Sequence, residues 1–209
     1  MINNILWDFD GIILYSMPIR DKGFTEIFKD FDKKKIDLLL LYHRENGGLS
    51  RYVKIRYFFE NILSEPISDK DILKYAANFS AIMRTELINP DNLINDSITF
   101  IRNNYENYNF HIVSGSDQNE LRFLCKELGI YDLFISIQGS PTHKNELVKN
   151  ILNDLNYIED ETILIGDSIN DYNAAVVNNI GFLGYNCDKV LDKTNKIRTI
   201  STFEKGVDF

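Results

Sequence analysis

The chain has 209 residues, of which 44% are hydrophobic, so it is long enough to bury a substantial core and is not expected to be disordered. Its 31 acidic and 23 basic residues give a net charge of -8, and no Lys/Arg-rich run stands out, so we expect neither nucleic acid nor anionic membranes as partners. Cys125 and Cys187 form no C-x-x-C motif, and the sequence has no signal segment or long apolar stretch, which favours a reduced, cytoplasmic protein.

The first part of the chain predicts one strand followed by helices. An apolar run over residues 3–8 indicates a buried strand, and Gly11 starts a tight turn that leads out of the sheet. Apolar residues then repeat at helical spacing in four segments. These segments start at Ser16, Lys33, Ser50 and Ser68. Because no strand is predicted among them, we expect residues 15–86 to form an inserted helical cap domain.

An alternation of helices and strands follows Asn89-Pro90. The predicted helices cover residues 94–105, 117–129, 147–155 and 174–178. The predicted strands cover residues 109–113, 133–138, 162–165 and 181–185, with a further short strand near 197–200. Strands separated by helices indicate a parallel sheet. We therefore predict an α/β fold, with a Rossmann-like parallel sheet core of residues 1–14 and 87–209 that carries the helical cap.

Two carboxylates, Asp8 and Asp10, come at the end of the first predicted strand. Open α/β sheets place their chemistry at the carboxyl ends of their strands. If Gly11 ends the strand, Asp10 turns so that both carboxylates approach one reacting atom, which suits a nucleophile paired with a proton carrier. The alternative is that this short motif provides only loop carboxylates or a helix cap.

Asp167 follows a predicted strand in the same way as Asp8, so the two carboxylates are expected to meet at one edge of the sheet. Two like charges brought together need a cation, and oxygen ligands with room for water and phosphate suit Mg²⁺. Asp171 lies four residues farther on and strengthens this prediction. The alternative is that Asp167 caps the helix that starts near Ser168.

Ser114 and Lys144 follow the second and third predicted strands of the core. We expect the Ser114 hydroxyl and the Gly115 amide to hold phosphate oxygens near a helix start, where anions bind readily. A site that gathers three carboxylates and a phosphate also needs a cation, which Lys144 provides. The alternatives are an ordinary helix cap at Ser114 and a solvated lysine at position 144.

In order and rough spacing, the four motifs resemble those of the haloacid dehalogenase (HAD) superfamily, over residues 1 to about 186. They are Asp8-Phe9-Asp10-Gly11, Ser114, Lys144 and Gly166-Asp167-Ser168-Ile169-Asn170-Asp171. The resemblance is to the subfamily of phosphoglycolate phosphatases and β-phosphoglucomutases, in which a helical cap is inserted into a HAD-like core. It implies that the substrate is a small phosphate ester and the cofactor is Mg²⁺.

The resemblance also implies a role for each carboxylate. The one at Asp8 attacks phosphorus to form an aspartyl-phosphate, and the one at Asp10 protonates the leaving oxygen and then activates water. Asp8, the backbone carbonyl of Asp10 and the carboxylate of Asp167 bind the metal, while Asp171 holds metal-bound water or the lysine.

Asp10 and Arg20 favour a phosphatase within this superfamily. Its dehalogenases lack a carboxylate at the Asp10 position, and its sugar-phosphate mutases have a histidine at the position of Arg20. A mutase remains the first alternative. The opening Trp7–Gly11 with Ser16–Arg20 is similar to phosphatases of bacterial surface-polysaccharide pathways, so we expect a sugar phosphate, an amino-alcohol phosphate or a conjugate as substrate. The protein would act as a monomer or homodimer.

A non-catalytic phospho-acceptor domain is the second alternative, and the cap argues against it, because a lid excludes water and selects substrates.

Within the cap, Arg20 and Arg51 are expected to bind the substrate. Arg51 follows Gly47-Gly48 in a loop that resembles the specificity loop of capped relatives, and a cation in the first turn of a helix opposes the helix dipole, so it needs another partner. The alternative is a solvated arginine. The histidines, without metal-ligand spacing, are interpreted as structural or surface groups.

Overall fold

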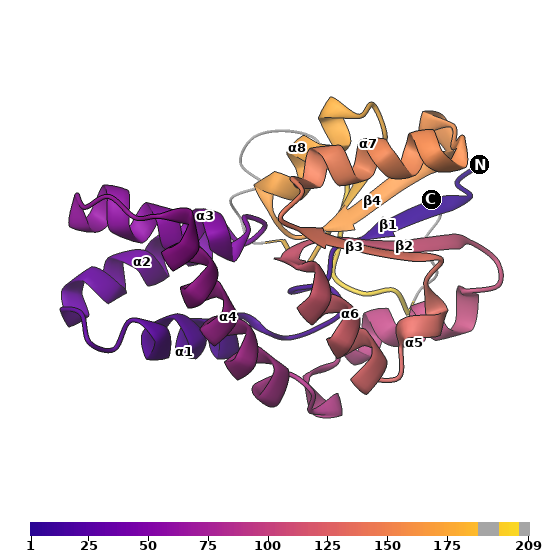
Figure 1. Ribbon diagram of the computed structural model, residues 1–209. Coiled ribbons are helices and arrows are strands. Elements are labelled where there is room, and N and C mark those ends of the chain that lie inside the picture. Colours follow the sequence, from indigo (N-terminus) through magenta and orange to yellow (C-terminus); the bar gives the residue numbers. More distant parts are fainter. Residues whose placement is uncertain (188–196, 205–209) are drawn as a thin grey trace.

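The computed structural model describes residues 1–187 and 197–204, and its centre is a parallel sheet in the order β3-β2-β1-β4-β5-β6 (Figure 1). The strands are β1 (Asn4–Trp7), β2 (Asn109–Asp117), β3 (Ser136–Ser140), β4 (Thr162–Gly166), β5 (Gly181–Tyr185) and β6 (Thr199–Ile200). β1 lies between β2 and β4, with Trp7 in register with Ile112 and Ile165. The carboxyl ends of these three strands therefore meet at one edge of the sheet.

Helices cover both faces of the sheet, as the alternation of strands and helices predicts (Figure 1). They are α5 (Asn95–Asn104), α6 (Gln118–Glu127), α7 (Lys144–Leu155) and α8 (Ile169–Val177). Because successive side chains of a strand point to opposite faces, Leu6 packs with Val148 of α7 and Ala174 of α8, while Trp7 packs on the other face in the cluster that contains Ile101 of α5 and Leu124 of α6. The strands are thus buried on both sides.

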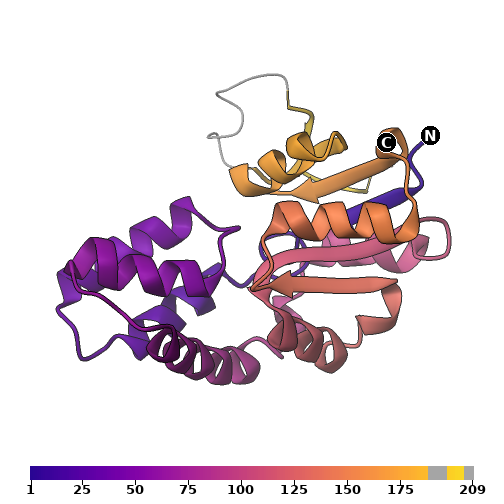
Figure 2. The same ribbon diagram turned by 45° about the horizontal axis from the view of Figure 1, so that its top comes forward.

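Four helices lie beyond the carboxyl ends of the strands, to one side of the sheet (Figure 2). They are α1 (Met17–Ile27), α2 (Lys33–Glu45), α3 (Arg51–Tyr57) and α4 (Asp69–Glu86), and a π-helical turn, η1 (Phe58–Leu63), continues α3. Aromatic rings fill the space between them: the ring centroids of Phe24 and Phe79 are 4.5 Å apart, and those of Phe28 and Phe58 are 4.2 Å apart. The aromatic run at Tyr57–Phe59 thus contributes to the core of the cap.

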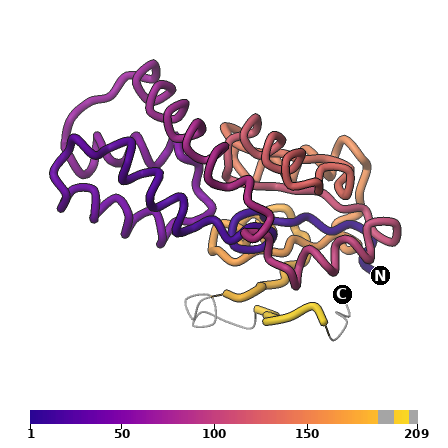
Figure 3. Tube along the Cα trace, turned by 90° about the horizontal axis from the view of Figure 1, so that it is seen from below, coloured from indigo at the N-terminus to yellow at the C-terminus, as the bar shows by residue number. Residues whose placement is uncertain are grey.

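The two segments that connect the cap helices to the sheet run side by side (Figure 3). The Tyr15 amide donates to the Asn92 carbonyl (2.8 Å), and the Ile94 amide donates to the Ile13 carbonyl (2.9 Å). These bonds hold the two connections together where the chain leaves the sheet for the cap helices and returns from them. That residues 15–86 form a domain of their own remains a prediction.

The structure confirms the α/β fold and its parallel sheet and corrects several element boundaries. The helices predicted over 147–155 and 174–178 begin earlier, at Lys144 and Ile169. The predicted strand 109–113 continues to Asp117, with a register shift after Val113, because Asp117 pairs with Ser140 of β3. The predicted strand 133–138 lies at 136–140 instead, since residues 131–133 form a helical turn, η3. The third cap helix becomes π-helical at Phe58. Two more turns are η2 (Pro90–Asn92) and η4 (Glu159–Glu161).

No helix among the described residues combines the length and the apolar character needed to cross a membrane. No disulfide links Cys125 and Cys187 in the described part of the chain, and the Cys125 side chain is buried, as its place on the apolar stripe of α6 predicts.

Candidate active site

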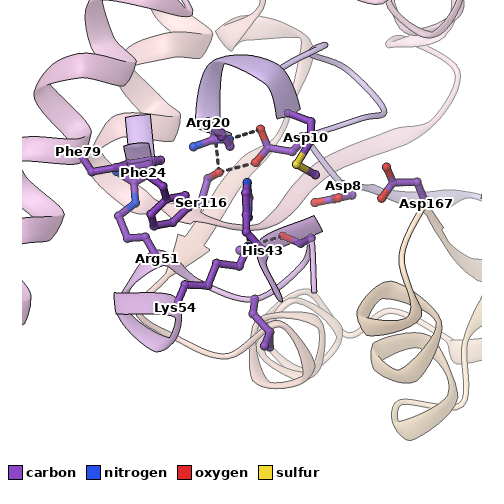
Figure 4. Close-up of a pocket in the computed structure, with 14 residues that line it drawn as sticks. Asp8, Asp10, Arg20, Phe24, His43, Arg51, Lys54, Phe79, Ser116 and Asp167 are labelled. Atoms are coloured by element: carbon purple, nitrogen blue, oxygen red, sulfur yellow. Dashed lines mark hydrogen bonds and ion pairs between the residues drawn. The ribbon is translucent and has the colours of Figure 1, made fainter. Parts of the chain in front are cut away.

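A pocket with an empty volume of about 470 Å³ lies between the carboxyl ends of the strands and the cap helices (Figure 4). The sheet side contributes Asp8, Asp10, Gly115, Ser116 and Asp167 to its lining. The cap side contributes Met17, Arg20, Phe24, His43, Gly47, Leu49, Arg51, Lys54 and Phe79. In Figure 4, Asp8 and Asp167 lie on one side of the pocket and Arg51 and Lys54 on the other. The motifs at the strand ends therefore face groups from the cap.

Asp8, Lys144 and Asp171 form a buried cluster. The Lys144 Nζ donates to Asp8 Oδ1 at 2.8 Å and also to Asp171 Oδ1. Burial, followed by the charge of Asp171, raises the pKa of Asp8 to about 7. Although burial favours the neutral amine, the two carboxylates raise the pKa of Lys144, so this lysine stays charged. Lys144 is thus the cation that the sequence predicts at this site, and it is not solvated.

Asp8, Asp167 and Asp171 each offer an oxygen atom, and these atoms lie within 4.8 Å of one another. Burial, followed by the charges of Asp8 and Asp171, raises the pKa of Asp167 well above its usual value. Three carboxylates this close together repel one another unless a cation neutralises them, and their hard oxygen ligands are those that Mg²⁺ prefers. The donor set therefore fits a magnesium ion.

The alternative role of Asp167 as a helix cap is wrong. The side chain of Ser168 accepts a hydrogen bond from the Asp171 amide, and the Asp171 carboxylate accepts one from the Ser168 amide, which completes a capping box at the start of α8. Asp167 is left free to face Asp8. Gly11 permits this approach, since its φ is +82° and a Cβ there would lie 2.1 Å from Asp167 Oδ2.

Asp10 accepts hydrogen bonds from three side chains around the pocket. These are Ser16 Oγ at 2.5 Å, Arg20 Nε at 2.7 Å and Ser116 Oγ at 2.6 Å. Burial favours the neutral carboxyl, but the charge of Arg20 and the bonds from Ser116 and Ser16 outweigh it and lower the pKa of Asp10 to about 2. The Asp10 carboxylate is thus held on the Arg20 side of the pocket. The predicted metal ligand at this position is the backbone carbonyl of Asp10 and not its carboxylate.

Ser114 lies inside β2 and does not cap a helix. Its hydroxyl accepts a hydrogen bond from the Ser116 amide at 3.1 Å, and α6 is capped instead by Asp117, whose side chain accepts from the amides of Asn119 and Glu120. The predicted helix starts within one residue of its expected position, at Gln118, and the end of β2 separates Ser114 from it. Ser114 is buried beside the pocket lining, whereas Gly115 forms part of that lining.

Glu120 is a functional candidate that the sequence analysis missed. Arg51, in the first turn of α3, forms two hydrogen bonds of 2.6 Å with the Glu120 carboxylate, and Arg20 Nη1 donates to the same group at 3.2 Å. The helix dipole disfavours a positive charge in the first turn, so Arg51 needs a negatively charged partner. Glu120 is that partner. We name Arg20, Arg51 and Glu120 the arginine–glutamate cluster. The available signal was an acidic residue one turn before Leu124, on the buried side of α6.

The arginine–glutamate cluster joins the cap to the sheet core. Arg20 and Arg51 come from α1 and α3, whereas Glu120 comes from α6, and all three side chains are buried. The Arg51 guanidinium also lies 4.7 Å from the ring centroid of Phe79, which fixes its plane further. Neither arginine is a solvated surface group.

His43 and Lys54 are two further pocket residues that the sequence analysis did not identify. The Lys54 Nζ lies 2.8 Å from His43 Nδ1 and donates to the Gly47 carbonyl at 3.2 Å. Burial lowers the pKa of His43 to about 2, so its ring is neutral. The available signal was the spacing of Lys54, one turn after Arg51 on the same face of α3. His111, by contrast, is structural, since it bonds Ser136 and Tyr157.

Comparisons with known proteins identify one family and one fold. The sequence model described as "Haloacid dehalogenase-like hydrolase" matches residues 5–185. A search of curated proteins gave no match.

Among solved structures, the β-phosphoglucomutase from Clostridium difficile is similar with a TM-score of 0.77 and 16% identity, covering 99% of this chain and 94% of its own. A predicted phosphatase from Clostridium acetobutylicum has a TM-score of 0.77 and 13% identity, covering 98% and 96%. CbbY from Rhodobacter sphaeroides, solved in complex with phosphate, has a TM-score of 0.74 and 16% identity, covering 99% and 97%. At these identities the likeness establishes the fold.

Proposed function

Because the chain belongs to the family of haloacid dehalogenase-like hydrolases, we propose that it is a Mg²⁺-dependent phosphatase that hydrolyses a small phosphate monoester through an aspartyl-phosphate on Asp8. One observation carries the proposal: the Asp8 carboxylate, bound by the buried Lys144, lines a pocket together with a second carboxylate, Asp10. This is the arrangement of a nucleophile and a proton carrier around one reacting atom.

In the first step, a carboxylate oxygen of Asp8 attacks the phosphorus atom of the ester. Asp10, whose pKa in this structure is about 2, has to take up a proton as the negatively charged ester binds. The bond between phosphorus and the ester oxygen then breaks, and that oxygen takes this proton from Asp10 and leaves as an alcohol. Lys144 holds Asp8 in place and offsets negative charge while the phosphoryl group passes to Asp8.

In the second step, a water molecule attacks the phosphorus of the aspartyl-phosphate. Asp10, now ionised, takes the proton from this water, and the bond between phosphorus and the Asp8 oxygen breaks. Inorganic phosphate is released, and both aspartates return to their starting states. The hydroxyl of Ser114 and the amide of Gly115 are proposed to hold phosphate oxygens in both steps.

Asp8, Asp167 and Asp171, with the backbone carbonyl of Asp10, would hold the Mg²⁺ ion. When bound, Mg²⁺ neutralises the charge of the carboxylates and of the phosphoryl oxygens, which lets two anions approach each other. The raised pKa values of Asp8 and Asp167 support this assignment, because both carboxylates need a cation nearby to be fully ionised at neutral pH.

The pocket residues contributed by the cap favour an enzyme over a phospho-acceptor domain. Arg20, His43, Arg51 and Lys54 bring four polar side chains over Asp8. A lid of this kind excludes water from the first step and selects the leaving group. We propose that Arg20 and Arg51 contact the substrate, which is a phosphorylated sugar or amino-alcohol, or a conjugate of one, such as surface-polysaccharide pathways use.

Water, rather than a second hydroxyl of a sugar, is proposed as the final phosphoryl acceptor. Arg20 occupies the position of the mutase histidine and is bonded to Asp10 and Glu120. Phosphorus NMR of glucose 1-phosphate with a bisphosphate activator distinguishes the two activities. A phosphatase releases inorganic phosphate, whereas accumulation of glucose 6-phosphate without free phosphate would establish a mutase.

Turnover of p-nitrophenyl phosphate tests the proposal. We expect the purified protein to release p-nitrophenol when Mg²⁺ is present, EDTA to stop the release, and Asp8→Asn to abolish it while the fold is retained, because the amide is nearly isosteric but is no nucleophile. Retained activity in Asp8→Asn, or equal activity with and without Mg²⁺, would contradict the proposal. A screen of phosphorylated metabolites would then identify the substrate.

A further inference from the structure

Lys54 is the charged group of the pocket that the proposed chemistry does not use. It lies on α3, and only 3% of its surface is exposed. Its amine bonds two neutral acceptors, His43 Nδ1 at 2.8 Å and the Gly47 carbonyl oxygen at 3.2 Å. An ammonium group has three N–H donors, so one donor of Lys54 is left for a ligand in the pocket that it lines.

Lys54 differs from the two arginines of the same pocket in its charge balance. Arg20 is paired with Asp10 and Glu120, and Arg51 is paired with Glu120. Across residues 1–187 and 197–204, no carboxylate forms an ion pair with Lys54. A buried ammonium without a counter-charge is unfavourable. Burial, followed by the charge of Arg20, accordingly lowers the pKa of Lys54 to about 7.

His43 holds the Lys54 amine in place and does not neutralise it. Because its ring is neutral, its Nδ1 accepts from the ammonium group and its proton lies on Nε2. Among the described residues, this buried Nε2 has no hydrogen-bond partner, and Asp21 Oδ1 lies 3.9 Å from it. In Figure 4 the His43 ring lies between Lys54 and the Arg20–Asp10 pair. The cap side of the pocket thus presents a cation and a neutral donor, with no anion bound to either.

We propose that Lys54 binds a second anionic oxyacid group of the substrate, located on the leaving-group side of the ester, and that His43 is the positioning residue for its amine. The inference rests on the proposed function, since it names a class of substrate for the same pocket. The transferred phosphoryl group is proposed to be held by residues of the sheet core, whereas Lys54 lies on the cap. A group bound by Lys54 therefore belongs to the leaving-group part of the ester. An anion there supplies the missing counter-charge.

Equilibrium binding to the Asp8→Asn variant tests this inference without turnover. Isothermal titration calorimetry in the presence of Mg²⁺ compares two matched pairs of esters. In the first pair, 3-phosphoglycerate carries a carboxylate where glycerol 3-phosphate carries a hydroxymethyl group. In the second, glucose 1,6-bisphosphate carries a phosphate that glucose 1-phosphate lacks. The two pairs distinguish a carboxylate from a phosphate as the second group.

We expect the ester with the second anion to bind roughly 10- to 100-fold more tightly in at least one pair, as for a hydrogen bond to a charged group. Adding Lys54→Met should remove this preference, and Lys54→Arg should restore part of it. Lys54→Gln repeats the test if the methionine variant does not fold. Lys74→Met, which removes an exposed cation from α4, is the matched control and should keep the preference.

Two outcomes would overturn the inference: no preference in either pair, or a preference that survives both Lys54→Met and Lys54→Gln. Equal weakening of all four esters would also overturn it, because Lys54 would then hold the transferred phosphate or only support the fold. Turnover of p-nitrophenyl phosphate by the unmodified protein is measured separately. Its absence would contradict the proposed function, while the binding comparison would still decide the role of Lys54.

Discussion

Asp8 and Asp10 lie two residues apart but have opposite electrostatic surroundings. Burial and the nearby Asp171 raise the pKa of Asp8 to about 7, whereas Arg20 and two hydroxyl groups lower the pKa of Asp10 to about 2 despite its burial. A pair of carboxylates with pKa values pushed apart is typical of a site in which the two groups have different tasks. For the proposed roles, a cation has to lower the pKa of Asp8, and the negative charge of the bound ester has to raise the pKa of Asp10.

Replacing Asp10 tests its role as proton carrier. Asp10→Asn should lower kcat by roughly 10²- to 10⁴-fold for an alkyl phosphate, because the departing alkoxide then leaves without a proton. The loss should be smaller for p-nitrophenyl phosphate, whose leaving group needs little protonation. Steady-state rates with both substrates check this. Equal losses on the two substrates would show that Asp10 does not protonate the leaving oxygen.

His111 should make the fold sensitive to acid. Burial lowers the pKa of His111 to about 4, compared with 6.5 in the unfolded chain. Between these values the unfolded state binds a proton that the folded state does not, so the free energy of unfolding falls as the pH falls. Through His111, the free energy of unfolding should fall by about 2 kcal/mol between pH 7 and pH 4.5.

Urea unfolding at these two pH values measures the effect. Between pH 7 and pH 4.5, the free energy of unfolding of His111→Gln should fall by about 2 kcal/mol less than that of the natural chain. An equal loss in the two proteins would mean that other groups cause the acid sensitivity.

At the scale of helices and strands, Glu120 of α6 holds two cap helices through Arg20 of α1 and Arg51 of α3. Without the Glu120 carboxylate, the buried Arg51 would lose its counter-charge, whereas Arg20 would keep Asp10. Glu120→Gln should therefore lower the free energy of unfolding by roughly 3–5 kcal/mol, as measured in urea. Glu127→Gln changes an exposed carboxylate of the same helix and is the control. Equal stability of the two variants would contradict the structural role of Glu120.

The loop at Gly47–Ser50 approaches β2 so closely that Gly115 has no room for a side chain. A Cβ on Gly115 would lie 2.4 Å from the carbonyl oxygen of Gly48, which belongs to the backbone and cannot move without the loop. Gly115→Ala should push the cap loop away from the sheet and lower kcat/KM for the natural type of substrate by at least about tenfold.

Gly47→Ala is the matched control for this prediction. A Cβ on Gly47 would meet only the methyl group of Met17, at 3.7 Å, so most of the activity should remain. The same kcat/KM in both variants would show that contact between Gly48 and Gly115 does not matter for catalysis.

The elements were predictable from sequence where a local pattern determined them. The helix Lys33–Glu45 has its predicted bounds, because its apolar spacing and its Asp32 cap are local. The end of β2 was placed too early, since Ser114 and Ser116 look like turn residues, but the strand continues through them to Asp117, which pairs with Ser140 of β3. Only the neighbouring strand, distant in sequence, decides that pairing.

For the molecule as a whole, the parallel sheet and the inserted cap helices bring together residues from the whole length of the chain. Asp8, Lys144 and Asp167 were predictable as candidates because each follows a strand-like run. Glu120 and Lys54 were not, because their partners come from other elements: Arg51 lies 69 residues from Glu120, and His43 lies 11 residues from Lys54. Sequence patterns give the strand ends, while the pairing between cap and core requires the three-dimensional structure.

Detection of a phosphoryl group on Asp8 tests the central claim most directly. The protein is mixed with p-nitrophenyl phosphate and Mg²⁺, quenched with acid during turnover, digested and analysed by mass spectrometry. We predict a phosphorylated peptide that contains Asp8, that loses its label on treatment with hydroxylamine as an acyl phosphate does, and that is absent from Asp8→Asn and from a sample with EDTA. Steady turnover without phosphorylation of this peptide, or phosphorylation elsewhere in the chain, would contradict Asp8 as the nucleophile.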